Sequence, residues 1–154
     1  LLVSEGGKVI QFPEDDVRVM GRAAAGVRGM KVADSDALIE GCVVGSQDMY
    51  IFTISETGMG KISSLEEYRE QGRGGSGIKV SATTTKTGKI IAAFTLSEEE
   101  KQAKSVILVS RSGQTVRLPL ADIRITGRNT QGVILAKLKD TDDTFTSATL
   151  AEEE

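Results

Sequence analysis

The sequence carries one short pattern three times: GRAAAGVRGMKV from Gly21, GRGGSGIKV from Gly72 and GRNTQGVILAKL from Gly127. Each copy has a Gly-Arg pair, three intervening residues, a second glycine, a β-branched residue and then an apolar and basic run. Three matches in one register indicate an internal repeat with a period of about 50 residues. The repeat, rather than any single motif, decides the fold.

A turn glycine lies upstream of each Gly-Arg pair. Gly7, Gly60 and Gly113 precede the pairs by 14, 12 and 14 residues. Strand-like runs lie before these glycines (LLVS, MYIFTI and SVILVS), and closing runs follow each core segment (ALIEGCVV, KIIAAFTL and TFTSATL). A glycine between two such runs is typical of a β-hairpin. Each repeat therefore predicts about four short strands, and the fold class is all-β.

Four strands in a period near 50 residues are typical of one blade of a propeller-like array. We expect blades over residues 1–48, 49–103 and 104–150, followed by an acidic tail at 151–154. Three blades cannot close a ring, because closed propellers have ~4–8 blades. The sequence starts with Leu1 rather than Met, so we expect an open arc trimmed from a larger protein. The one segment predicted to be helical is 63–70, with Ser63 and Glu66 as a capping box.

Composition favours binding over catalysis. The chain has no histidine and a single cysteine, which excludes Ser-His-Asp and Cys-His catalysis, His-ligated metal sites and an internal disulfide. Cys42 is predicted to be a core residue in a reducing cytoplasm. The segment 56–63 lacks the first glycine and the Ser or Thr of a P-loop, so it is interpreted as a hairpin turn. No metal or cofactor is expected, and no apolar run is long enough to span a membrane.

Charge is segregated along the chain, although the net charge is −3. Residues 17–32 carry four basic residues and no acid, and residues 104–139 carry seven basic residues and one acid, Asp122. Segregated charge of this kind can bind a polyanion such as DNA. The predicted DNA-binding residues are Arg18, Arg22, Arg28, Lys61, Arg69, Arg73, Lys79, Arg117, Arg124 and Arg128.

The repeated arginines Arg22, Arg73 and Arg128 allow two interpretations. Equivalent places in successive blades would form a row of cations along a curved rim, suited to the backbone of a bent duplex. Alternatively, they are solvated turn residues or caps on a neighbouring blade. The glycine-rich segment 71–77 likewise predicts either an anion-binding nest or a flexible loop.

The strings VRVMGRAAAGVRGMKV, GMGKISSLEEYREQGRGGSGIKV and DIRITGRNTQGVILAKL resemble successive blades of the C-terminal domain of DNA gyrase A. The resemblance covers nearly the whole chain. It implies a β-pinwheel, a ring of about six four-stranded blades that exchange a strand with their neighbours, of which this chain resembles the last three. The family's signature box reads QRRGGKG. A degenerate copy is formed by Gln71, Gly72, Arg73, Gly74, Gly75, Ser76 and Gly77.

The resemblance also implies a function. The rim of the family's domain wraps duplex DNA, without sequence readout, and so supports ATP-dependent negative supercoiling. The rest of gyrase A and the gyrase B protein are the implied partners in an A2B2 complex in the cytoplasm, at the bacterial nucleoid. The catalytic tyrosine and the ATPase are expected outside this chain, so Tyr50 and Tyr68 are predicted to be packing residues.

Two alternatives stay open. The related A protein of topoisomerase IV shares the architecture but resembles these strings less closely. A protein-interaction or structural array of blades without DNA wrapping of its own is the second alternative. An enzyme in its own right is disfavoured by the missing histidine and the failed P-loop pattern.

Overall fold

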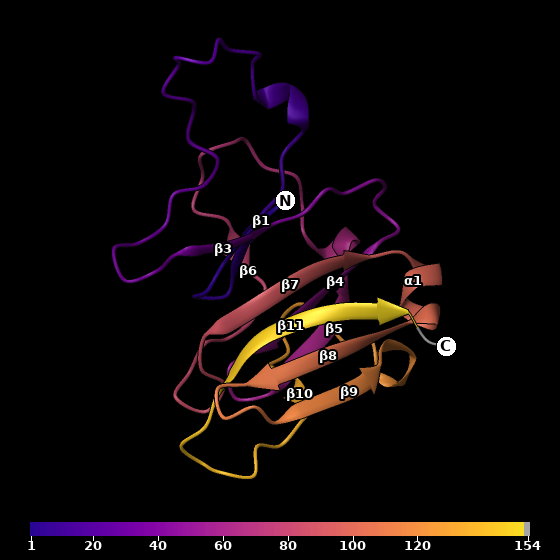
Figure 1. Ribbon diagram of the computed structural model, residues 1–154. Coiled ribbons are helices and arrows are strands. Elements are labelled where there is room, and N and C mark those ends of the chain that lie inside the picture. The colour runs from indigo at the N-terminus through magenta and orange to yellow at the C-terminus, as the bar shows by residue number, and fades with distance from the viewer. Residues whose placement is uncertain (153–154) are drawn as a thin grey trace.

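Three antiparallel sheets follow one another along the chain in the computed structural model, which describes residues 1–152 (Figure 1). The strand order is β3-β1-β2-β6 in the first sheet, β10-β5-β4-β7 in the second and β11-β8-β9 in the third. The strands are β1 Leu2–Ser4, β2 Lys8–Ile10, β3 Leu38–Gly41, β4 Tyr50–Ser55, β5 Met59–Ser64, β6 Ile78–Lys79, β7 Ile90–Leu96, β8 Lys104–Ser110, β9 Thr115–Pro119, β10 Val133–Ile134 and β11 Phe145–Glu152. The predicted all-β fold of three blades in an open array is confirmed.

In each of the first two sheets, one of the two edge strands is supplied by the following repeat. β6 lies in the second repeat and pairs with β2, so that Val9 faces Ile78. β10 lies in the third repeat and pairs with β5, so that Gly60 faces Val133. No fourth repeat follows in this sequence, and within residues 1–152 the third sheet has three strands rather than the predicted four, with β9 as its edge.

The acidic tail predicted at 151–154 begins inside the third sheet. Ala151 and Glu152 belong to β11 and lie opposite Ser105 and Lys104 of β8. Residues 153–154 lie outside the described part of the chain.

Glycine turns connect β1 to β2, β4 to β5 and β8 to β9. The turn glycine of the second repeat is Gly58, not Gly60 as the sequence predicted, because Gly58 has φ +86° while Gly60 lies in β5 opposite Ile54. Gly7 and Gly113 have φ values of +79° and +90°, in the left-handed region that glycine adopts without a steric penalty. With Gly58 in this place, the turn glycine precedes the Gly-Arg pair by 14 residues in all three repeats.

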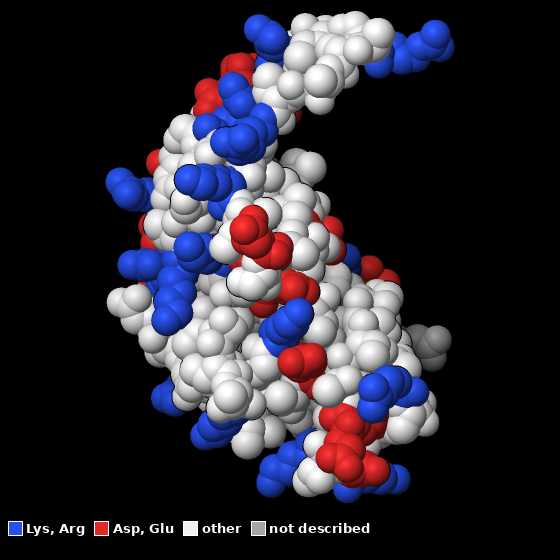
Figure 2. All heavy atoms as spheres, turned by 90° about the vertical axis from the view of Figure 1, so that its left-hand side faces the viewer, with Lys and Arg blue, Asp and Glu red and all other residues white. Residues whose placement is uncertain are grey.

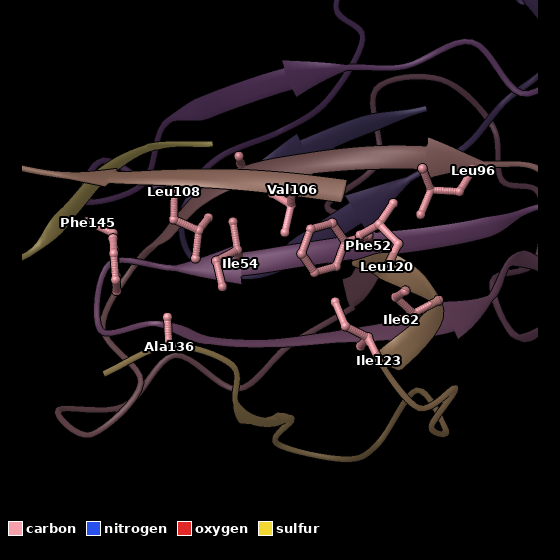
Figure 3. Packing of buried hydrophobic residues seen from close by; sticks show 11 residues of the cluster. Phe52, Ile54, Ile62, Leu96, Val106, Leu108, Leu120, Ile123, Ala136 and Phe145 are labelled. Atoms are coloured by element: carbon pink, nitrogen blue, oxygen red, sulfur yellow. The ribbon is translucent and has the colours of Figure 1, made fainter. Parts of the chain in front are cut away.

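The core lies between the sheets, because successive residues of β4 face opposite sides. Ile51 faces the first sheet, in a cluster with Val3, Val9, Leu65, Tyr68, Val80 and Ala93. Phe52 and Ile54 face the third sheet, in a cluster with Ile62, Ala92, Leu96, Val106, Leu108, Leu120, Ile123, Ala136 and Phe145 (Figure 3). Full burial of one such side chain contributes about 1.5–3 kcal/mol, so these contacts join neighbouring repeats strongly.

Helical structure differs from the prediction. Each repeat has one short 3-10 helix after its second strand, at Glu14–Asp16, Leu65–Glu67 and Leu120–Asp122. Ser63 does not cap the second of these, because it lies in β5 and its hydroxyl is 2.7 Å from that of Tyr68; the hydroxyl of Ser64 accepts from the amide of Glu66 instead.

The α-helix α1, Glu98–Ala103, was not predicted. It begins with a capping box, in which Ser97 and Glu100 accept hydrogen bonds from each other's backbone amides. The box was readable in the sequence, but EEEKQA has no apolar periodicity to indicate a helix.

Three further predictions concern single side chains and the membrane. Cys42 is half-buried just after β3 and lies outside both clusters, which corrects the predicted core position. Tyr68 is 1% exposed and packs between the first two sheets, as predicted. Burial raises the pKa of its phenol to about 12. The described residues contain no helix of the length and hydrophobicity needed to cross a membrane.

Candidate nucleic-acid interface

Arginine recurs at two fixed positions of every repeat when residues are counted from the turn glycine. Arg18, Arg69 and Arg124 lie eleven residues after Gly7, Gly58 and Gly113, and we name them the outer row. Arg22, Arg73 and Arg128 lie fifteen residues after the same glycines, and we name them the Gly-Arg row. Each arginine of the outer row was predicted as a DNA-binding residue, but their equivalent positions in the three repeats were not recognised. Counted from Gly60, the turn glycine that the sequence predicted, Arg69 is out of register with Arg18 and Arg124.

The outer row is turned to solvent by the local backbone. The residue before each of these arginines ends a 3-10 helix in an extended conformation. In the second and third repeats that residue, Tyr68 or Ile123, is buried in the core. Side chains alternate along extended backbone, so the arginine that follows points outward.

All three guanidinium groups of the outer row are exposed. None of them makes a hydrogen bond or ion pair with another of the 152 described residues. Each therefore keeps its donors available for an external anion.

Two of the three arginines of the Gly-Arg row, Arg73 and Arg128, donate hydrogen bonds within the protein. The Nη1 atom of Arg73 donates to the carbonyl oxygen of Arg28 at 2.8 Å, and its Nε atom donates to that of Asp16 at 3.0 Å. The Nη1 atom of Arg128 donates to the carbonyl oxygen of Lys79 at 3.4 Å. Both side chains are half-buried, whereas Arg22 is exposed and has no such partner within residues 1–152.

Lys61 is not on the surface. Its side chain is 2% exposed, and its Nζ atom donates to the carbonyl oxygens of Gly127, Arg128 and Thr130 at 3.3, 2.6 and 2.9 Å. Burial lowers the pKa of this ammonium to about 8. The structure thus assigns Lys61 to the support of the third Gly-Arg loop and removes it from the predicted contact residues.

The three remaining predicted residues are Arg28, Lys79 and Arg117. Arg28 and Lys79 lie twenty-one residues after their turn glycines, and both are exposed. Arg117 lies on β9 and its Nη2 atom donates to the carbonyl oxygen of Glu152 at 2.7 Å, so part of its donor capacity is used.

The glycine-rich segment 71–77 packs on the first repeat. The amides of Gln71 and Gly74 donate to the carbonyl oxygens of Gln11 and Gly29 at 2.8 and 2.7 Å. These two N–H groups are therefore not free for an anion. Gly74 and Gly77 have positive φ values of +85° and +74°, which accounts for glycine at both places.

Charge is segregated on the surface as it is along the sequence. Figure 2 shows many Lys and Arg side chains along one edge of the molecule, while acidic side chains gather across the middle and lower part of the same face, with some basic ones among them. The described residues hold no group of three His, Cys, Asp or Glu side chains placed to bind a metal ion. The arrangement suits the binding of a polyanion along an edge.

Comparison with known proteins identifies the family. A sequence model of the family described as DNA gyrase C-terminal domain, beta-propeller, matches residues 1–40, 50–97 and 104–151, which is most of the chain. The chain belongs to this family. The resemblance predicted from the three repeated strings is thereby confirmed.

Relatives of the gyrase family match nearly the whole chain. The DNA gyrase A protein of Pseudomonas aeruginosa is 41% identical over 138 residues, which are 90% of this chain and 14% of that protein. The DNA gyrase A protein of Kosmotoga olearia is 38% identical over 148 residues, which are 96% of this chain and 18% of that protein. The chain therefore spans less than a fifth of the length of these relatives.

Solved structures share the fold. A structure of the DNA gyrase A C-terminal domain has a TM-score of 0.82 and 25% identity, and the match covers 97% of this chain and 49% of that one. A crystal structure of the C-terminal domain of DNA topoisomerase IV has a TM-score of 0.86 at 22% identity, covering 98% of this chain and 46% of that one. The second likeness concerns the fold alone.

Proposed function

We propose that this gyrase-family chain binds duplex DNA through its phosphates and supports DNA wrapping by the C-terminal domain of a gyrase A protein. The observation that carries the proposal is the outer row. It places one exposed arginine without an internal partner at the same position of each repeat. Exposed cations at equivalent positions of successive repeats suit the phosphates of a bent duplex.

Arginine is suited to this role, since its planar guanidinium can bind a phosphate through two parallel N–H donors. Contacts to phosphate position a protein on DNA without reading the sequence, so we expect little sequence preference. Among the residues predicted from the sequence, those that are exposed and make no side-chain bond within the protein are the proposed contacts: Arg18, Arg22, Arg28, Arg69, Lys79 and Arg124. Arg117 remains a candidate because it is exposed, although one of its donors is used within the protein. Lys61, Arg73 and Arg128 are left out because they are buried or half-buried and donate within the protein.

The proposed parent enzyme is a gyrase rather than a topoisomerase IV, because the sequence relatives described above are gyrase A proteins. The strand-cleaving tyrosine would then lie elsewhere in gyrase A and the ATPase in the gyrase B protein of an A2B2 complex acting on the bacterial nucleoid. No cofactor is proposed for this chain.

The test is fluorescence anisotropy of a labelled ~40-base-pair duplex across a salt series. Substituting all three residues of the outer row by alanine should reduce the slope of log K against log salt by roughly 2.7, since each lost phosphate contact removes about 0.9. The control replaces Arg22 alone, which is exposed and belongs to neither junction between repeats, and should reduce the slope by about 0.9. Absence of binding at low salt would overturn the proposal and indicate a structural spacer.

A second candidate function is protein docking through exposed valines of the first repeat. Val17, Val19 and Val43 lie in the segments after β2 and β3 and are 44%, 102% and 88% exposed, although apolar side chains of this size are usually buried. Docking on these residues would be insensitive to salt and to substitution of the outer row. Sedimentation velocity at two salt concentrations distinguishes it from DNA binding.

A further inference from the structure

Each repeat places an acidic residue close to its exposed arginine. Asp16, Glu67 and Asp122 lie nine residues after the turn glycine, at the last position of the 3-10 helix, and two residues before the outer row. A carboxylate beside a cation that binds phosphate repels the same phosphate. Electrostatics of DNA binding therefore gives no reason for an acid at this position, and another role must account for it.

The first two of these carboxylates reach the following repeat. An oxygen of Glu67 accepts a hydrogen bond from the backbone amide of Arg128 at 2.6 Å, and an oxygen of Asp16 accepts from the amide of Arg73 at 3.4 Å. The amides are those of the Gly-Arg row. Equivalent acids thus bind equivalent amides across both junctions between repeats.

The side chains of the same arginines donate hydrogen bonds to the preceding repeat. Arg73 and Arg128 donate to the carbonyl oxygens of Arg28 and Lys79, which both lie twenty-one residues after their turn glycine. Each junction therefore has two kinds of hydrogen bond. A carboxylate of one repeat accepts from a backbone amide of the next repeat, and the arginine that carries this amide donates to a carbonyl oxygen of the preceding repeat. Hydrogen bonds to charged groups are stronger than those between neutral groups.

We propose that these pairs, Asp16 with Arg73 and Glu67 with Arg128, are clamps that set the angle and spacing between successive repeats. The clamp residues position the outer row, and with it the curvature imposed on the duplex, without touching DNA themselves. The part of this inference that concerns DNA rests on the proposed function. The part that concerns the junction rests on the hydrogen bonds alone.

The rest of the junction repeats with the clamp. The amide of Gln71 donates to the carbonyl oxygen of Gln11, and the amide of Thr126 donates to that of Ile62, each at 2.8 Å. The carbonyl oxygen of Gly58 accepts from the amides of Leu135 and Ala136, just as that of Gly7 accepts from Val80 and Ser81. The two junctions therefore share one geometry, and one clamp serves as a model for the other.

The ends of the chain supply internal controls. Within residues 1–152, Asp122 accepts no hydrogen bond from a Gly-Arg amide, and the guanidinium of Arg22 donates to no carbonyl oxygen. A substitution at either place removes the same chemical group as a clamp substitution but leaves both junctions intact.

The experiment compares Glu67→Ala, Glu67→Gln and Asp122→Ala in the full chain. Both Glu67 variants remove one negative charge, but glutamine keeps an oxygen acceptor for the Arg128 amide. Hydrogen exchange followed by NMR should show about tenfold faster exchange of that amide in Glu67→Ala, the effect of one lost hydrogen bond. Glu67→Gln and Asp122→Ala should resemble the wild type. Equal exchange rates in all four proteins would overturn the clamp.

The second measurement is the end-to-end distance of a doubly labelled duplex, by energy transfer at saturating protein. Glu67→Ala should bind at least as tightly as the wild type, since a negative charge is lost, yet bend the duplex less. Glu67→Gln should gain affinity with unchanged bending. Equal bending by Glu67→Ala and the wild type would overturn the role in curvature. If no protein binds DNA, the proposed function fails while the exchange experiment still decides on the clamp.

Discussion

At the scale of single residues, Lys61 has a role that its charge does not reveal. It lies in a strand between apolar residues, and its ammonium holds three carbonyl oxygens of the loop that carries Arg128. The corresponding positions of the other repeats, three residues after the turn glycine, are Ile10 and Val116. The buried cation is therefore a feature of one junction, added to the hydrogen bonds that both junctions share.

Lys61→Met should reduce the free energy of unfolding at pH 7 by about 1–3 kcal/mol, because carbonyl oxygens lose their donor. Urea denaturation measures the change. Lys86→Met is the control, since Lys86 is exposed and a surface substitution of this kind changes stability little. A Lys61→Met protein as stable as the wild type would contradict the assigned role.

The same lysine predicts a pH dependence. Its pKa in the folded protein, about 8, lies below its ordinary value of 10.5. Between these values the unfolded chain binds more protons than the folded one, so this group makes the free energy of unfolding rise with pH. The rise should be present in the wild type between pH 8 and 9.5 and absent in Lys61→Met. Parallel pH profiles of the two proteins would contradict the lowered pKa.

At the scale of elements, the hairpin turns do more than reverse the chain. Gly58 and Gly113 have the same left-handed backbone, with φ +86° and +90°. A Cβ atom on Gly58 would collide with the carbonyl oxygen of Ala136, whereas a Cβ atom on Gly113 would meet nothing within 4 Å. The turn of the second repeat is thus also the surface on which the third repeat packs.

Gly113→Ala should cost about 1–2 kcal/mol, the penalty of a side chain in the left-handed region. Gly58→Ala should cost about 1–3 kcal/mol more, because the neighbouring backbone must move away. Urea denaturation of the two variants side by side measures the difference, since the backbone strain is common to both. Equal losses of stability would contradict the close packing at Gly58.

At the scale of the whole molecule, stability comes from the layers between sheets. Tyr68 and Ile123 occupy the same position of the second and third repeats, ten residues after the turn glycine. They are 1% and 5% exposed, because each lies between two sheets. Their counterpart Val17 is 44% exposed, and it belongs to neither of the two core clusters of residues 1–152. The same position is thus core in the second and third repeats and exposed in the first.

Ile123→Ala should therefore reduce the free energy of unfolding by about 2–5 kcal/mol, the usual cost of a cavity in a core. Val17→Ala should change it by less than about 0.5 kcal/mol. Chemical denaturation followed by circular dichroism measures both. A loss of several kcal/mol at Val17 would indicate that the first sheet has a contact that the structure lacks.

The repeat, the all-β class and the segregation of charge were determined by the sequence alone, because glycine spacing and strand patterns are local signals. The sequence alone did not determine that Gly58 is a turn glycine, that α1 forms, or which charged side chains are exposed and which are buried or bonded within the protein. Gly58 and Gly60 are both flanked by strand-like runs, and backbone pairing across the sheet decides between them.

The tertiary structure also distinguished the outer row, whose side chains are exposed and have no internal partner among residues 1–152, from Arg73 and Arg128 of the Gly-Arg row, which bond within the protein. From the sequence, both rows were predicted to bind DNA. Arg128 bonds to Lys79 and Glu67, which lie 49 and 61 residues earlier, and Arg73 bonds to Arg28, 45 residues earlier. No local pattern contains partners at such separations. Whether an arginine faces solvent or holds a neighbouring blade depends on how the repeats pack, and packing is decided by the whole chain folding together.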